Sequence, residues 1–123
     1  MNFPANLKYS KTHEWVKDLG NGFFEIGISD FAQKELGDIV YINLPKAGDA
    51  LKTGKSFADV ESVKAVSDII SPINGTVREA NEKVTSSPEL INKDPYESWL
   101  IRAEGSIPQG GLLSADEYGK SIN

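Results

Sequence analysis

Cysteine is absent from this chain of 123 residues. Without thiols, the chain can form neither disulfides nor thiolate metal sites. Redox chemistry at a thiol of the protein itself is excluded for the same reason. We infer that any sulfur or electron chemistry in which this chain takes part must be supplied by a cofactor.

Basic side chains are also scarce. The only arginines are Arg78 and Arg102, and 13 Lys and Arg stand against 18 Asp and Glu, which gives a formal net charge of −5. Nucleic acids are bound chiefly through clustered basic side chains, whereas the lysines here are scattered along the chain. The composition therefore argues against nucleic-acid binding, and the acidic surface favours partners with basic patches.

Long apolar runs and targeting features are missing as well. No run approaches the roughly 20 apolar residues of a membrane-spanning helix. Residues 1–8 have neither the apolar core of a signal peptide nor the arginines of a transit peptide. We expect a cytoplasmic protein of bacterial type that does not contact a membrane.

Catalytic side chains are equally sparse. His13 is the only histidine, and although Glu14 follows it, a metalloprotease motif would need a second histidine where Lys17 stands. One histidine, no cysteine and no phosphate-binding loop leave little for acid–base, nucleophilic or metal catalysis. We predict a non-catalytic protein without a metal site, in which His13 has a structural role.

Alternation of apolar and polar residues is the dominant pattern. Such period-two runs, bounded by Gly, Pro and Asn, indicate half-buried β-strands. Three runs place their apolar members on one face: Phe24, Ile26 and Ile28; Val40, Ile42 and Leu44; and Trp99, Ile101 and Ala103. Phe24, Ile26 and Trp99 are expected in the core, and the predicted fold class is mainly β.

Three short helices are predicted beside the strands. Ser29 is expected to cap a helix that ends at Leu36, just before a glycine. Ser87-Pro88 is expected to begin a second helix, with the serine as cap. Ser114 and Glu117 have capping-box spacing before a third. The chain length fits a single domain.

Lys64 lies at the centre of a predicted hairpin. Two strand-like runs, 56–61 and 65–70, flank it, and Gly54 and Gly75 lie ten and eleven residues away. Together with Gly48, these glycines are interpreted as turn residues with positive φ. An isolated hairpin lysine is usually a solvated charge, but a lysine at a tight tip is also well placed to be gripped and modified by an enzyme.

The sequence around Lys64 resembles the lipoyl-attachment hairpin of glycine cleavage H proteins. The similarity lies in ESVKA at 61–65, SD at 67–68 and SPING at 71–75. Further matching segments run in order through the chain: LKY at 7–9, THEW at 12–15, IGI at 26–28, LGDIV at 36–40, LP at 44–45, LIN at 90–92, DPY at 94–96 and LLSADEY at 112–118. This many ordered matches identify the family far better than a lone VKA would.

The resemblance implies a fold, a cofactor and a function. The fold would be a flattened β-barrel, or barrel-sandwich hybrid, related to biotinyl and lipoyl domains, with short peripheral helices and one domain over 1–123. Lys64 would carry lipoate through an amide, as N6-lipoyl-lysine, after the action of a lipoate-attaching enzyme.

As a swinging arm in glycine catabolism, this group would carry the aminomethyl group of glycine. It would receive it from the pyridoxal-phosphate-dependent glycine decarboxylase and pass it to the tetrahydrofolate-dependent aminomethyltransferase. Dihydrolipoamide dehydrogenase would then reoxidise the dithiol. The carrier itself would have no catalytic role, and a monomer suits such a shuttle.

The resemblance also points to residues that would shelter the loaded arm. The matching positions are Thr12, Glu14 and Asp68, although an exposed strand charge is the ordinary interpretation of such a carboxylate. The sequence departs from the family at two places. Phe31 stands where some members have histidine, and only two residues, 97–98, separate a tyrosine from Trp99 where many members have three.

Other carriers fit the sequence less well. Biotinyl domains usually flank their lysine with methionines, and lipoyl domains of 2-oxoacid dehydrogenases typically place Asp before it, whereas Lys64 lies between Val63 and Ala65. A lipoyl relay, which passes its lipoyl group to other proteins without serving glycine cleavage, stays open as an alternative.

Overall fold

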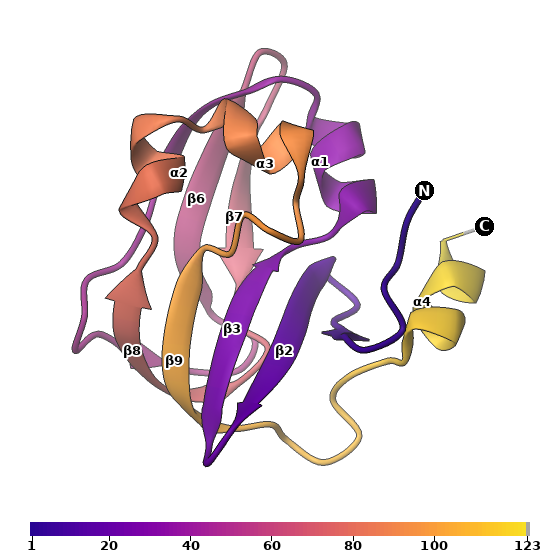
Figure 1. The fold of residues 1–123 in the computed structure, drawn as a ribbon, viewed down its shortest axis with the longest axis vertical. Helices are drawn as coiled ribbons and strands as arrows, with labels where there is room; N and C mark the ends of the chain where they lie inside the picture. The colour runs from indigo at the N-terminus through magenta and orange to yellow at the C-terminus, as the bar shows by residue number, and fades with distance from the viewer. Residues whose placement is uncertain (123) are drawn as a thin grey trace.

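Two antiparallel β-sheets pack against each other, and short helices lie at their edges (Figure 1). The computed structural model describes residues 1–122. One sheet has the strand order β1-β2-β3-β9-β8-β5 and the other the order β4-β6-β7. The mainly β fold class predicted from the alternating runs is therefore confirmed.

The strands of the larger sheet are β1 (Lys8–Tyr9), β2 (Glu14–Gly20), β3 (Phe23–Ile28), β5 (Ala50–Leu51), β8 (Asn74–Ala80) and β9 (Ile101–Ser106). Those of the smaller sheet are β4 (Ile39–Asn43), β6 (Ser56–Ser62) and β7 (Val66–Ile70). The helices are α1 (Asp30–Leu36), α2 (Glu82–Ser86), α3 (Glu89–Lys93) and α4 (Ala115–Ser121).

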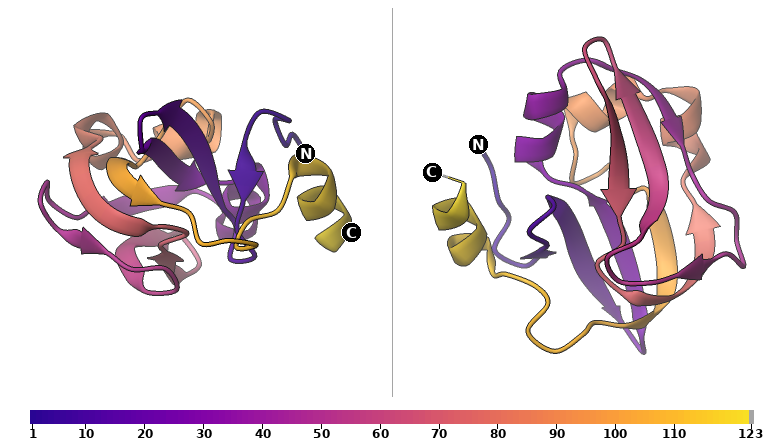
Figure 2. Two further views of the ribbon diagram at one scale, coloured as in Figure 1. Left: turned by 90° about the horizontal axis from the view of Figure 1, so that it is seen from below. Right: turned by 180° about the vertical axis from the view of Figure 1, so that it is seen from behind.

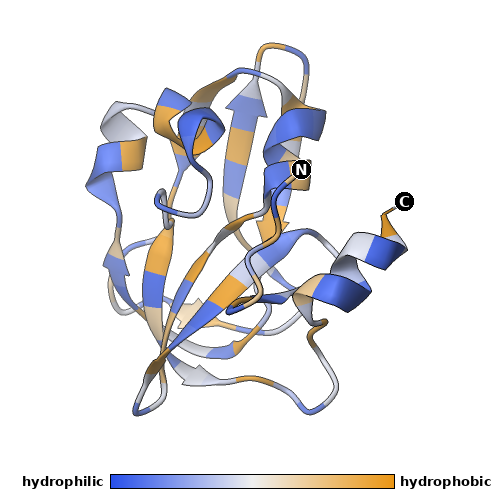
Figure 3. Ribbon diagram, turned by 45° about the vertical axis from the view of Figure 1, so that its right-hand side comes forward, coloured by the Kyte–Doolittle hydropathy of each residue, from blue (hydrophilic) through white to orange (hydrophobic). Residues whose placement is uncertain are grey.

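The core fills the space between the sheets and continues under the helices. Phe57 packs against two apolar clusters. The strand residues of one come from the larger sheet, and the other joins residues of the smaller sheet to Ile28 of β3, Val84 of α2 and Ile91 of α3. Coloured by hydropathy, the strands alternate between apolar and polar residues (Figure 3). Each fully buried aliphatic or aromatic side chain in these clusters contributes roughly 1.5–3 kcal/mol to stability.

Strand β3 is buried on both faces, which a simple alternation does not predict. Trp15 is fully buried on the second face, lies opposite Gly27 in the β2–β3 register and donates from its indole N–H to the Pro95 carbonyl at 3.0 Å. A Cβ on Gly27 would lie 2.6 Å from the Trp15 indole. Gly27 therefore leaves the space that this indole occupies.

The predicted register of β4 is wrong. The strand is irregular between Ile39 and Tyr41, so Ile39 and Ile42 are buried while Val40 is 54% exposed. A bulge adds one residue to a strand, so the side chains before it point to the opposite face from the one that regular alternation predicts. The expected one-sided run of Val40 and Ile42 therefore does not form.

Trp99 was expected in the core on the same face as Ile101, but it is only partly buried. It precedes β9, and the Arg102 guanidinium covers its ring at 4.0 Å from the centroid. Trp15, not Trp99, is the fully buried tryptophan.

Two of the helix starts are confirmed. The Ser29 side chain caps α1 by accepting from the Ala32 N–H, and Ser114 and Glu117 form a complete capping box on α4. The second start is shifted. Pro88 is itself the N-cap residue of α3 and makes no side-chain cap, because Ser87 ends the preceding helix α2.

Gly75 is not a turn residue. Gly48 and Gly54 have positive φ as expected, with values of 98° and 86°, but Gly75 lies within β8 opposite Gly105 of β9. A Cβ on Gly105 would collide with the Asn74 carbonyl oxygen, and one on Gly75 with the Glu104 carbonyl oxygen. The two glycines allow the strands to approach more closely than side chains permit.

We expect Gly105→Ala to lower the free energy of unfolding by about 2 kcal/mol or more, because the added methyl group forces β8 and β9 apart. Gly119→Ala in α4 is the matched control. Its methyl group would meet Phe3 at an ordinary 3.6 Å, and helix propensity should raise stability by up to about 1 kcal/mol. Urea unfolding of both variants tests this, and equal stabilities would contradict it.

Candidate functional site

The turn at the tip of the β6–β7 hairpin carries Lys64. The strands pair antiparallel, and the Ser62 N–H donates to the Ala65 carbonyl over 2.8 Å, so Val63 and Lys64 form a two-residue loop. The Lys64 side chain is exposed. This turn is the topmost part of Figure 1 and is seen from behind in Figure 2, so the predicted hairpin with Lys64 at its tip is confirmed.

A serine side chain sets the shape of this turn. Two-residue hairpin loops favour turns with positive φ, yet neither Val63 nor Lys64 has positive φ. Instead the Ser62 Oγ accepts from the N–H groups of Lys64 at 3.3 Å and Ala65 at 3.1 Å. Short polar side chains stabilise turns in this way, so no glycine is needed beside the lysine.

The tip is attached to the connection between α1 and β4. The Val63 N–H donates to the Asp38 carbonyl at 2.9 Å. The stem of Lys64 passes near Gly37, where an added Cβ would be 3.4 Å from the Lys64 Cε. The lysine is therefore presented from a turn that is fixed on one side.

The outer face of the smaller sheet is acidic. Asp59 lies directly opposite Asp68, and Glu61 directly opposite Val66, which is 71% exposed. Within residues 1–122, none of these three carboxyl groups forms an ion pair. Like charges placed opposite each other destabilise a sheet. Asp68 is therefore available to a cationic group, about 13 Å along β7 from Lys64.

Glu14 is buried rather than exposed, with a side chain that joins the two sheets. Only 2% of Glu14 is exposed. Its carboxylate accepts hydrogen bonds from the hydroxyl groups of Ser10 and Thr12 and from the Ile70 N–H at the end of β7. Burial raises the pKa of Glu14 above its ordinary value, and these hydrogen bonds oppose that shift.

The three predicted arm contacts lie at different depths. Thr12 is exposed and touches Glu14, which lies beneath it. Asp68, two residues before Ile70 in β7, is exposed. Among the described residues it makes no hydrogen bond to Thr12 or Glu14. Of the three predicted residues, Glu14 is bonded to the end of β7 that is remote from the tip, Thr12 is bonded to Glu14, and Asp68 lies within β7.

His13 has a partner that the sequence did not reveal. Its Nδ1 lies 2.8 Å from the Tyr118 hydroxyl, which also lies 2.7 Å from the Ser29 Oγ. Burial lowers the pKa of His13, and the Glu35 carboxylate opposes this. The Tyr118 hydroxyl thus links α4 both to His13 and to Ser29 at the start of α1, which agrees with the structural role expected for His13. Tyr118 lies 105 residues away in sequence, and no local signal marks it.

The two departures from the family have visible consequences. The Phe31 ring packs against His13 with centroids 4.7 Å apart, so apolar packing occupies this position. The short connection before Trp99 forms a tight turn. There the Asp94 Oδ1 accepts from the N–H groups of Tyr96 and Glu97.

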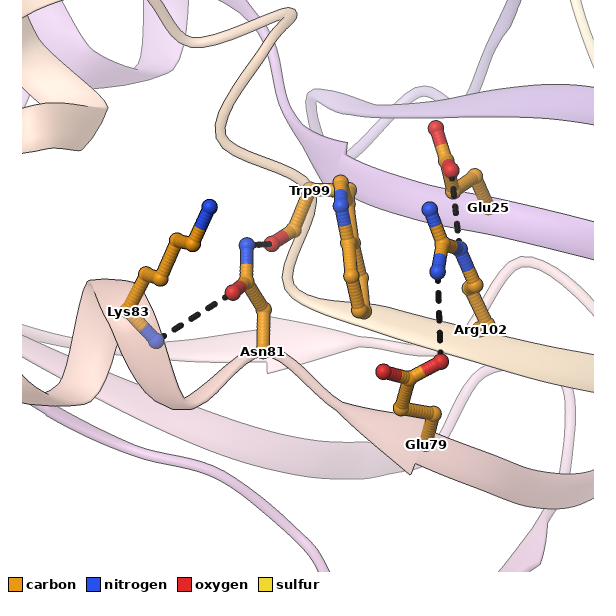
Figure 4. A network of polar contacts seen from close by, with 6 residues as sticks. All are labelled: Glu25, Glu79, Asn81, Lys83, Trp99 and Arg102. Atoms are coloured by element: carbon orange, nitrogen blue, oxygen red, sulfur yellow. Dashed lines mark hydrogen bonds and ion pairs between the residues drawn. The ribbon is translucent and has the colours of Figure 1, made fainter.

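A groove of about 820 Å³ lies elsewhere, between β8, β9 and the start of α2. Figure 4 shows the Trp99 ring standing between Asn81 and Arg102. Arg102 is paired with Glu25 at 3.0 Å and Glu79 at 3.2 Å. These charges satisfy one another, and the groove contains none of the predicted site residues.

Across 1–122, no group of three or more His, Cys, Asp or Glu is placed to hold a metal ion. No helix in that range is both long and apolar enough to cross a membrane.

Comparison with known proteins identifies the family of this chain. A family model for the glycine cleavage H-protein matches residues 7–123. The chain belongs to the glycine cleavage H-protein family. Relatives include glycine cleavage system H proteins of Alteromonas mediterranea, 49% identical, and Coprothermobacter proteolyticus, 52% identical. Each match covers 99% of this chain, and the matches cover 97% of the Alteromonas protein and 98% of the Coprothermobacter protein.

A solved structure agrees with the fold. The crystal structure of a glycine cleavage system H protein from Mycobacterium marinum matches with a TM-score of 0.90 and 34% identity, over 97% of this chain and 98% of that one. It confirms the two-sheet, barrel-sandwich architecture expected from the resemblance.

Family membership decides the kind of function. Members of the glycine cleavage H-protein family are lipoyl carriers of the glycine cleavage system, and they take part in glycine catabolism as non-catalytic components. Their cofactor is a lipoyl group bound covalently to lysine. An exposed primary amine on a fixed turn, in a chain without thiols, suits that cofactor.

For Glu14 we expect a distinctive pH dependence. Its pKa is raised by burial, so the stability it contributes is fully present below the unfolded-state value of 4.5 and is lost as pH rises through the raised pKa. Glu14→Gln removes this loss, so the variant should gain stability relative to wild type between pH 4 and pH 7.

Urea unfolding at both pH values measures the difference. Glu61→Gln, at an exposed carboxyl, controls for the change in net charge. A stability difference between Glu14→Gln and wild type that stays constant with pH, or moves in the opposite direction, would contradict the expectation.

Proposed function

We propose that Lys64 is the lipoyl-attachment residue of this H-protein family member. The observation that carries the proposal is the exposed Lys64 at the tip of a two-residue turn held by Ser62 and Asp38. A ligating enzyme must reach the ε-amino group from outside, and an exposed hairpin tip leaves it accessible on several sides.

The lipoyl group supplies the disulfide and dithiol chemistry that this cysteine-free chain lacks, and with it a carrier for the aminomethyl group of glycine. The chain's own part is to hold and present the arm. Attachment by a long flexible stem gives a high local concentration of the carried group at each partner site. The amide also removes the Lys64 charge next to the acidic face formed by Asp59, Glu61 and Asp68.

Thr12 and Asp68 are proposed to contact the loaded arm, with Glu14 acting from beneath. Asp68 lies opposite Asp59 and offers to a cation a carboxylate that has no ion-pair partner among residues 1–122. Thr12 offers an exposed hydroxyl whose position is fixed by its bond to Glu14. Because Glu14 is 2% exposed, its contribution passes through Thr12 and through the Ile70 N–H.

The proposal includes the partners that such a carrier requires. These are the pyridoxal-phosphate-dependent glycine decarboxylase, the tetrahydrofolate-dependent aminomethyltransferase, dihydrolipoamide dehydrogenase and a lipoate-attaching enzyme. We further propose a single domain over 1–123 that acts as a monomer in the cytoplasm. The packing of Phe57 against both central clusters supports one continuous core, and the bacterial relatives support the location.

Co-expression with a lipoate-attaching enzyme and lipoate is expected to add one lipoyl group, confined to the peptide that contains Lys64. Lys64→Arg should take up none and fail to support glycine decarboxylation, while its stability changes by less than about 0.5 kcal/mol, because the side chain is exposed. Peptide mass spectrometry and urea unfolding provide the measurements.

Lys55→Arg is the matched control, since Lys55 is an exposed lysine beside the opposite end of β6. It should be modified like wild type. A lipoyl group on another lysine, or decarboxylation supported by Lys64→Arg, would refute the assignment. A lipoylated protein that supported no glycine decarboxylation but passed its lipoyl group to other proteins would identify it as a relay.

A further inference from the structure

Residues 37–39, between α1 and β4 in the sequence, form a short segment that hydrogen-bonds to α3 on one side and to the Lys64 turn on the other. On the side of the turn, the Asp38 carbonyl accepts from the Val63 N–H at 2.9 Å. A Cβ on Gly37 would lie only 3.4 Å from the Lys64 Cε, so the lysine stem passes close to this segment. The segment therefore sets where the tip of the hairpin lies.

On its other side, the segment is held by one side chain, Asn92 of α3. The Asn92 Nδ2 donates to the Gly37 carbonyl at 2.9 Å and to the Gln33 Oε1 at 3.0 Å, and its Oδ1 accepts from the Ile39 N–H at 2.8 Å. Two bonds to the backbone on either side of Asp38 fix that residue, although Asn92 contacts neither of the tip residues through an observed hydrogen bond.

We propose that Asn92 is a positioning residue for the modification of Lys64, acting through residues 37–39. The proposal rests on Lys64 being the attachment site. An enzyme that modifies Lys64 binds the turn in one conformation. If the turn also samples other conformations, the apparent dissociation constant rises, because only the fraction of molecules in the competent conformation can bind. Loss of Asn92 should therefore weaken recognition and leave the chemical step unchanged.

Asn92→Ala has a matched control in Asn81→Ala. Asn81 also ties a helix to a loop, because its Nδ2 donates to the Trp99 carbonyl at 2.7 Å and its Oδ1 accepts from the Lys83 N–H at 3.2 Å. Asn81 makes no contact with residues 37–39 or with the turn among its described hydrogen bonds. Both variants lose comparable bonds, so general destabilisation should affect both.

The test combines two measurements on the full chain, at a temperature where each variant is folded. In lipoyl attachment by a lipoate-attaching enzyme, Asn92→Ala should raise KM about three- to tenfold with kcat unchanged. Hydrogen exchange at the Val63 amide should become faster in Asn92→Ala. Asn81→Ala should match wild type in both. If Asn92→Ala does not fold, Asn92→Asp keeps the acceptor for Ile39 and loses only the donated bonds.

Unchanged Val63 exchange or unchanged KM in the folded Asn92 variant overturns the proposal, and so does an equal effect in Asn81→Ala. The wild type is assayed first. A wild type that takes no lipoyl group at Lys64 overturns the attachment site itself, which is a different result from a modified wild type with an unaffected variant.

Discussion

A buried carboxylate links the two sheets by a hydrogen bond. Glu14 belongs to β2 in the larger sheet, and its side chain accepts from the Ile70 N–H at the end of β7 in the smaller one. Burying such a group without partners would cost several kcal/mol, and the hydroxyl groups of Ser10 and Thr12 offset much of that cost. The position of the hairpin that presents Lys64 thus depends on a polar contact far from its tip.

Much of the fold could be predicted because its signals are local. Period-two alternation located β3, β4, β6, β7 and β9, whereas β2 and β8 were not among the predicted runs. Side-chain caps at Ser29 and Ser114 located two helices. The failures have physical causes. A bulge at Ile39–Tyr41 turned Val40 outward, which no alternation pattern records. Gly75 was mistaken for a turn residue because glycine also serves close strand approach, and that use becomes visible only with Gly105 beside it.

The candidate site likewise has features that local sequence predicts and features that depend on contacts between distant residues. The place of Lys64 at the hairpin tip was predictable because its flanking residues form a continuous motif, and Ser62 within that motif builds the turn. The depth of Glu14 was not predictable, since a charged residue in a strand is exposed by default, and its partners include a backbone amide 56 residues away. Asn92 and Tyr118 were missed for the same reason: their roles depend on contacts across the fold.

The turn at Val63 and Lys64 requires neither glycine nor positive φ, and both side chains lie in solvent. Folding therefore places little constraint on which residues occupy these two positions. Selection there comes almost entirely from the enzymes that read the turn. A scaffold of this kind could exchange one attached prosthetic group for another through a few surface substitutions, with its core untouched.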